Sequence, residues 1–93
     1  MQTDLFIDNQ FLPAASGRRF DVVNPATEEV LASVAEAQAD DVDRAVRSGR
    51  TTFESDAWRK LSARRRGGML LKAADLLAAR LPEVAELESR QNG

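Results

Sequence analysis

The sequence predicts an α+β fold in which two β-hairpin-like units within residues 1–36 precede three amphipathic helices within residues 37–93. Short β-branched and aromatic runs separated by turn residues fill the first third of the chain, and the apolar spacing then changes to the helical period. Aromatic residues make up only 5% of the 93 residues, so the core is expected to be aliphatic and rich in alanine, which suits helices. The length suits a single domain.

The first hairpin is predicted over residues 5–12, Leu-Phe-Ile-Asp-Asn-Gln-Phe-Leu. Its turn is Asp8-Asn9, because both residue types tolerate the positive φ that a tight two-residue turn requires. The stretch from Pro13 to Gly17 is rich in breakers and marks a loop.

The second hairpin is predicted over residues 19–34, where two β-branched runs flank Asn24-Pro25-Ala26-Thr27. Pro25 has a fixed φ and favours an extended residue before it, and the Asn24 side chain can accept a hydrogen bond from the backbone two residues later. Four short strands so close in sequence are expected to form one small antiparallel sheet.

The first helix is expected over roughly residues 40–54, with Asp40 and Asp41 providing the N-cap and negative charge in the first turn. One face carries the apolar residues Val42, Ala45, Val46, Gly49 and Phe53. Gly49 would permit close approach of a partner helix. Trp58, which follows, is expected to close the core between two helices; the alternative is a ring that stacks on a ligand.

A second helix is expected after Ser62, a good N-cap residue. Its apolar stripe is about 160° wide, which indicates contact with more than one neighbouring element. The stripe consists of Met69, Leu70, Ala73, Ala74, Leu76, Leu77 and Leu81. Pro82 is predicted to begin a third helix, and Asn92-Gly93 suits a helix C-cap or a turn.

Composition excludes several kinds of chemistry. The chain has no cysteine and no histidine, which removes thiol nucleophiles, disulfides, and the commonest general base and transition-metal ligand. The net charge of −2 gives no reason to expect nucleic acid or an anionic membrane as a partner. The first residues, Met1 to Asp4, lack the features of a secretory signal, and the cytoplasm is the expected compartment.

The candidate motifs all have a simpler structural interpretation. Arg64-Arg65-Arg66 could contact phosphate or nucleic acid, but three consecutive residues point around a helix, and an exposed first turn with Arg64 or Arg66 paired to an acid is the favoured interpretation. Gly67-Gly68 lies inside a helical pattern with no strand before it, unlike a nucleotide-binding loop. The adjacent acids Glu28-Glu29 and Asp40-Asp41 diverge and suit turns and caps. No catalytic residue and no cofactor-binding residue is therefore predicted.

The ordered motifs resemble the start of the aldehyde dehydrogenase superfamily over nearly the whole chain. The matching segments are LFIDNQF at 5–11, SGRRFDVVNPATEEVLASV at 16–34, ADDVDRAV at 39–46, the pair Phe53 and Trp58, LLKAADLLAARL at 70–81 and LESRQNG at 87–93. The Asn24-Pro25-Ala26-Thr27 turn is the most distinctive of them. The resemblance implies that residues 1–93 are the N-terminal segment of a Rossmann-like cofactor-binding domain, with the catalytic and oligomerisation regions elsewhere.

The resemblance also implies the activity of the family, the oxidation of an aldehyde to a carboxylic acid with NAD or NADP. The family's nucleophilic cysteine, its glutamate and its cofactor contacts have no counterpart among residues 1–93. We therefore expect this chain to be an N-terminal piece of a homo-oligomeric aldehyde dehydrogenase and to be inactive alone. The alternative is a stand-alone, non-enzymatic helical interaction module derived from that family.

One site of the family could map onto this chain. Some members bind a monovalent cation at the backbone corresponding to Val22-Val23, helped by an acid near the position of Gln91. The Gln91 amide can offer a carbonyl oxygen, although the charge is lost. A second departure is Arg65, where the family often has a glutamate that completes a capping box with Ser62.

Overall fold

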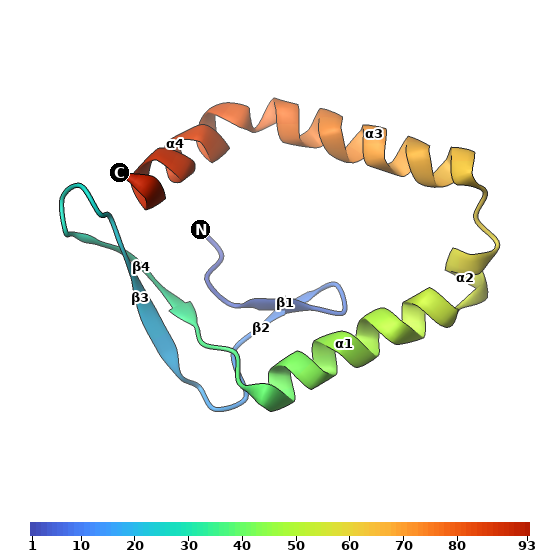
Figure 1. Cartoon of the computed structure of the whole chain (residues 1–93), viewed down its shortest axis with the longest axis horizontal. Coiled ribbons are helices and arrows are strands. Elements are labelled where there is room, and N and C mark those ends of the chain that lie inside the picture. The colour runs from blue at the N-terminus through green and yellow to red at the C-terminus, as the bar shows by residue number, and fades with distance from the viewer.

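The computed structural model describes residues 1–93 as four strands followed by four helices (Figure 1). The strands are β1 (Leu5–Ile7), β2 (Gln10–Leu12), β3 (Arg19–Val23) and β4 (Val30–Ala35). The helices are α1 (Ala39–Glu54), α2 (Asp56–Arg59), α3 (Ala63–Ala79) and α4 (Leu81–Asn92). The predicted α+β class and both hairpins are confirmed.

The strands form two separate antiparallel pairs, β1–β2 and β3–β4, so the expectation of one four-stranded sheet is wrong. The breaker-rich loop between β2 and β3 turns the second hairpin away from the first. The two pairs are joined instead through the N-terminus, where the Ala35 amide donates to the Thr3 carbonyl at 2.8 Å. The Arg19 guanidinium reinforces this junction by donating to Asp4 at 3.0 Å.

The first turn forms as predicted, because Asp8 and Asn9 both adopt positive φ, 51° and 61°. The turn pairs Ile7 with Gln10 and places Phe6 opposite Phe11, with ring centres 4.9 Å apart. This two-residue geometry matches the twist of the flanking strands.

The second turn also follows the sequence, since the Asn24 side chain accepts a 2.9 Å hydrogen bond from the Ala26 amide. Glu28 completes the turn at φ 63°. The register shifts between Val22, which pairs with Ala32, and Val23, which pairs with Val30. The extra residue on β4 is therefore a β-bulge that bends the hairpin.

The helices differ from the prediction in number and in their first cap. The N-cap of α1 is Gln38 rather than Asp40 or Asp41. A fourth helix, α2, is a single turn that begins because the Ser55 hydroxyl accepts from the Trp58 amide at 3.4 Å. The predicted beginnings of α3 after Ser62 and of α4 near Pro82 are confirmed.

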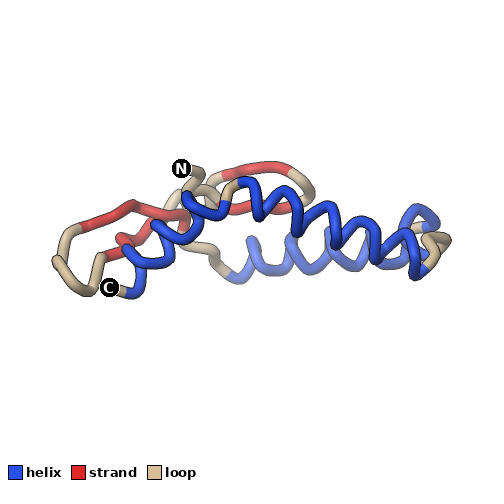
Figure 2. The backbone as a smooth tube through the Cα atoms, turned by 90° about the horizontal axis from the view of Figure 1, so that it is seen from above, coloured by secondary structure: helices blue, strands red, loops and turns tan.

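The elements outline an open, flat frame with dimensions of 49 × 34 × 16 Å, and α1 and α3 run along opposite sides of it (Figures 1 and 2). The radius of gyration is 16.8 Å, whereas about 12 Å is usual for a compact domain of this length. Only four residues are buried: Ile7, Ala14, Ala35 and Asp41. Trp58 therefore closes no core between the long helices, and no atom outside the helix backbone comes within 4 Å of a Cβ added at Gly49.

Candidate functional site

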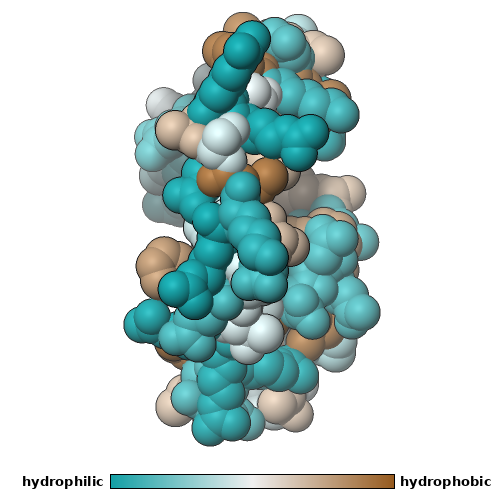
Figure 3. All heavy atoms as spheres, turned by 90° about the vertical axis from the view of Figure 1, so that its right-hand side faces the viewer, coloured by the Kyte–Doolittle hydropathy of each residue, from teal (hydrophilic) through white to brown (hydrophobic).

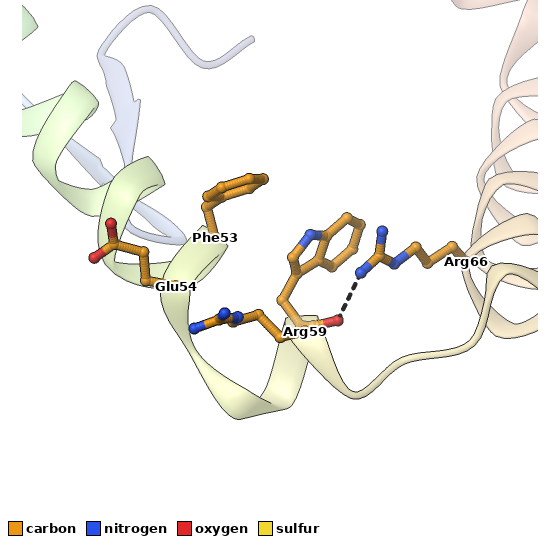
Figure 4. A pocket seen from close by; sticks show the side chains of 5 residues that line it. Phe53, Glu54, Arg59 and Arg66 are labelled. Carbon is orange, nitrogen blue, oxygen red and sulfur yellow. Dashed lines mark hydrogen bonds between the residues drawn. The ribbon is translucent and has the colours of Figure 1, made fainter.

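A hollow of about 710 Å³ lies at the corner formed by α1, α2 and α3. It is lined by Phe53, Glu54, Trp58, Arg59 and Arg66 (Figure 4). Seen from this end, the surface is mainly hydrophilic, with small apolar areas between charged side chains (Figure 3). We refer to these five residues as the corner site.

Local hydrogen bonds set the shape of the corner. The Trp58 carbonyl accepts from the Leu61 amide at 3.1 Å and from the Arg66 guanidinium at 3.0 Å. The Ser62 hydroxyl caps α3 by accepting from the Arg65 amide at 3.1 Å. Ser62 is the N-cap of α3 and stands four residues before Arg66. Arg66 therefore lies in the first turns of α3, where its guanidinium reaches the end of α2.

Arg66 also lies over the Trp58 ring, with its guanidinium carbon 4.3 Å from the ring centre. One terminal nitrogen bonds to the Trp58 carbonyl, while the Nε atom is buried and has no hydrogen-bond partner. The ring's negative face offers electrostatic compensation for the cation. The corner therefore presents a fixed guanidinium beside two aromatic rings, an arrangement suited to receiving a carboxylate or packing against a neighbouring segment.

The expected pairing of Arg64 or Arg66 with an acid is wrong. Nearby acids are engaged within their own helices: Asp56 pairs with Lys60 at 3.4 Å, and Glu54 lies 3.8 Å from Arg50. The Arg66–Trp58 contact was not predicted. The two residues are eight positions apart and lie in different helices. Helical periodicity relates residues within one helix only, so it could not predict this contact.

Asp41 is the most buried side chain, 1% exposed, at the start of α1. Its carboxylate accepts from the Gln38 amide at 2.9 Å and from the Ala15 amide at 3.0 Å, and it lies 3.6 Å from Arg44. These amide bonds, more than the Arg44 charge, hold the pKa of Asp41 below its usual range, although desolvation opposes them. Asp41 is therefore a structural group that ties the loop after β2 to α1.

The candidate cation residues come from two separate elements. Val22 and Val23 end β3, whereas Gln91 lies in the last turn of α4. The end of α4 approaches the turn after β3, since a Cβ added at Gly93 would lie 3.2 Å from Pro25 Cγ. No hydrogen bond joins Gln91 to either valine, and no cluster of three acidic residues is present. The cation site therefore stays a prediction.

None of the helices is long and apolar enough to cross a membrane.

Comparison with known proteins shows the family to which the chain belongs. A family model described as the aldehyde dehydrogenase family matches residues 11–93. The putative aldehyde dehydrogenase DhaS of Bacillus subtilis (strain 168) is 46% identical over 89 residues, which cover 96% of this chain and 18% of that protein. A mitochondrial aldehyde dehydrogenase of Leishmania tarentolae is 46% identical over all 93 residues, again 18% of that protein.

Solved structures agree with the sequence match. An aldehyde dehydrogenase from Bacillus cereus, described as an NAD⁺ complex, superposes with a TM-score of 0.95 at 41% identity and covers 100% of this chain and 19% of that one. The frame formed by residues 1–93 matches the N-terminal part of that larger enzyme structure. The chain belongs to the aldehyde dehydrogenase family, and it spans about 18% of the length of the curated relatives it matches.

Proposed function

We propose that these residues serve an NAD- or NADP-dependent aldehyde dehydrogenase that oxidises an aldehyde to a carboxylic acid. The observation that carries this proposal is the match over residues 11–93 together with the TM-score of 0.95 to an enzyme described as an NAD⁺ complex. The similarity covers hairpins, turns and helices in order, and so it supports a shared fold rather than a single shared motif.

The contribution of residues 1–93 is structural. They contain no cysteine to act as a thiolate nucleophile. Residues 1–36 supply two hairpins and residues 37–93 the helices of the proposed cofactor-binding domain. Their role is to form part of the frame around which the remaining fold is organised, while the reacting groups and the aldehyde contacts come from outside residues 1–93.

The cofactor itself does not fit these residues. A dinucleotide cradle needs glycines at the turn between a strand and a helix, where backbone amides face the phosphates. Here Gly67 and Gly68 lie within α3, and α2 rather than a strand precedes them. We therefore place the NAD or NADP contacts of the proposed enzyme outside residues 1–93 and derive no step from this segment.

The test is a fused enzyme in which residues 1–93 replace the matched 19% of the Bacillus cereus aldehyde dehydrogenase. We expect it to fold and to reduce NAD⁺ with a panel of aliphatic and aromatic aldehydes, monitored by NADH absorbance. A soluble, folded fused enzyme without turnover would contradict the proposal. Residues 1–93 alone should give no turnover.

The second candidate is a non-enzymatic interaction module. It would require a cooperative unfolding transition and a monodisperse particle for residues 1–93 alone. The open frame with four buried residues favours the enzyme segment, because so small a core cannot offset the entropy of ordering the chain.

Three finer proposals accompany the enzyme assignment. The assembled protein is a homo-oligomer, Val22, Val23 and Gln91 take part in binding a monovalent cation, and the cytoplasm is its compartment. Relatives described as mitochondrial make cell fractionation the appropriate test of the last point.

A further inference from the structure

A second hollow, of about 500 Å³, lies between the first hairpin and α1. Its two walls are held together by β1, which contacts the helix (Figure 1). The volume falls within the range of small-molecule sites. The lining side chains are mainly polar: Ile7, Asp8, Gln10, Leu12, Arg44, Arg47, Ser48 and Thr51. We refer to these eight residues as the hairpin–helix hollow.

The helix wall of the hollow presents hydrogen-bond donors along one side of α1. Arg44, Arg47, Ser48 and Thr51 stand at positions i, i+3, i+4 and i+7, which are neighbours on a helix surface. No hydrogen bond within the chain engages the Ser48 or the Thr51 hydroxyl. Two guanidiniums and two hydroxyls therefore line this wall, and these are the side-chain donors that bind phosphate oxygens.

Both guanidiniums remain available to a ligand. Arg44 lies 3.6 Å from Asp41, which is beyond hydrogen-bond distance. The carboxylate of Asp41 is already bonded to two backbone amides, so it does not depend on Arg44. Arg47 contacts Asp43 through its Nε atom at 2.9 Å, and this i,i+4 pair is exposed. Exposed pairs of this kind are weak, so an anion can compete for the Arg47 side chain.

The hairpin wall has a different chemistry. Ile7 pairs with Gln10, and the alternation of side chains along a strand puts Leu12 on the same face as Gln10. Asp8, at the turn, is the only acid that lines the hollow, and no ion pair engages its carboxylate. A carboxylate and an amide oxygen on this wall can accept hydrogen bonds from hydroxyl groups. The lining side chains carry two positive charges and one negative charge, so the hollow as a whole favours an anion.

We propose that the hairpin–helix hollow binds a small phosphorylated polyhydroxy compound. Its phosphate lies against the arginines and hydroxyls of α1, and its hydroxyl groups bond to the hairpin wall. Inorganic phosphate would leave the hairpin acceptors unused, and an uncharged polyol would leave the guanidiniums unused. This binding goes beyond the proposed oxidation of an aldehyde and does not depend on it. Because the ligand contacts both walls, it also stabilises the first hairpin against α1.

The test titrates glycerol 3-phosphate, inorganic phosphate and glycerol into the fused enzyme by isothermal titration calorimetry. Low ionic strength is used, because salt screens exposed charges. We expect saturable binding of glycerol 3-phosphate, weaker binding of phosphate and no binding of glycerol. Arg44→Gln should weaken the binding of glycerol 3-phosphate about tenfold, since charge-assisted hydrogen bonds are lost. Arg50→Gln is the matched control: it removes the same charge from the same helix, but Arg50 does not line the hollow, and the affinity should not change.

Asp8→Gly tests the hairpin wall separately. Glycine adopts the φ of 51° at this turn position freely, so the substitution removes the carboxylate and keeps the turn. The preference for glycerol 3-phosphate over inorganic phosphate should fall, while inorganic phosphate binds at least as tightly as before. A preference that Asp8→Gly leaves intact would refute the contact between the ligand hydroxyls and this wall.

Amide hydrogen exchange locates the ligand without relying on its affinity. Glycerol 3-phosphate should slow the exchange of the β1–β2 amides and leave that of the β3–β4 amides unchanged. Absence of saturable binding, equal affinities of the Arg44→Gln and Arg50→Gln variants, or equally tight binding of acetate would each overturn the inference. These readouts are separate from turnover: an active fused enzyme that does not bind glycerol 3-phosphate refutes only the inference, and a binding enzyme without turnover refutes only the proposed function.

Discussion

The guanidinium of Arg66 stacks on the Trp58 ring at 4.3 Å and also donates a 3.0 Å hydrogen bond to the Trp58 carbonyl. One side chain thus fixes both the ring and the backbone of the preceding helix. This contact links α2 to α3 across the Leu61-Ser62 connection. The angle between α1 and α3 consequently depends on it.

Replacing Arg66 with methionine keeps an unbranched stem of about the length of the arginine stem but removes the guanidinium, and with it the stack and the hydrogen bond. We expect the Arg66→Met fused enzyme to lose about 1–2 kcal/mol in its free energy of unfolding. Urea denaturation followed by tryptophan fluorescence measures it. Arg64→Met serves as the control, since Arg64 is exposed and without an ion pair, and a change as large there would contradict the role of the Arg66–Trp58 contact.

Asp41 predicts a pH dependence of local stability. Its pKa is lowered in the folded chain, chiefly by the Gln38 amide, so its contribution is fully present above the unfolded pKa, near the ordinary value of 3.8, and is lost as the pH falls through the lower folded value. Amide hydrogen exchange of Ala15 and Gln38 should therefore accelerate below about pH 4, beyond the intrinsic effect of pH. Asp41→Asn should remove this pH dependence and increase the exchange of both amides at neutral pH. Unchanged protection of the two amides in this variant would contradict the proposed role of Asp41 in joining the loop after β2 to α1.

Asn9 tests the first turn. Asn9→Val in the fused enzyme places a β-branched residue at φ 61° and should cost about 1–2 kcal/mol in stability. Asn9→Gly, which adopts positive φ freely, should stay within about 0.5 kcal/mol of the wild type. Thermal unfolding distinguishes them, and equal melting temperatures for the two variants would show that the turn conformation does not matter.

Arg65 offers a stabilising substitution. Position 65 is the third residue of α3, its amide is already bonded to Ser62, and a glutamate there could return a bond to the Ser62 amide. Arg65→Glu should stabilise the fused enzyme by about 0.3–1.5 kcal/mol, partly by removing positive charge from the helix N-terminus. Arg65→Gln separates the capping contribution from the charge. A loss of stability in Arg65→Glu would indicate that Arg65 has a partner elsewhere in the enzyme.

The proposed cation site predicts a response to Gln91→Glu. A carboxylate restores the negative charge that a hard cation prefers to a neutral amide. The melting temperature of the Gln91→Glu fused enzyme should therefore rise more between choline chloride and potassium chloride than that of the unsubstituted fused enzyme. Glu88→Gln, one turn earlier on α4, is the control for a general effect of charge. Identical salt responses in all three proteins would exclude the site.

Features determined by neighbouring residues were predictable from the sequence. The Asp8-Asn9 turn, the Asn24 side-chain bond and the beginning of α3 after Ser62 all depend on residues within a few positions. Features that depend on residues far apart in the sequence could not be predicted in this way. The separation of the hairpins follows from the path of the loop after β2, and no local pattern reports the bond from the Ala15 amide to Asp41.

The same distinction applies to the candidate site. The width of its apolar stripe predicted that α3 needs more than one neighbour, and the structure leaves this stripe exposed among residues 1–93. Gly49 was expected to permit close approach of a partner helix, and the structure leaves the space around it open. The cation residues Val22, Val23 and Gln91 came from the family resemblance alone.

The open frame has a consequence for the order of events during synthesis. Each hairpin and helix is closed by bonds among neighbouring residues, and such local elements form within microseconds, far faster than the ribosome adds residues. The hairpins and helices can therefore form transiently as they leave the ribosome, but the arrangement between them is not held, and the apolar helix faces stay uncovered, until later residues arrive. Chaperone binding to nascent chains should accordingly be strongest while α1 and α3 are exposed and should fall once the remainder of the domain has emerged.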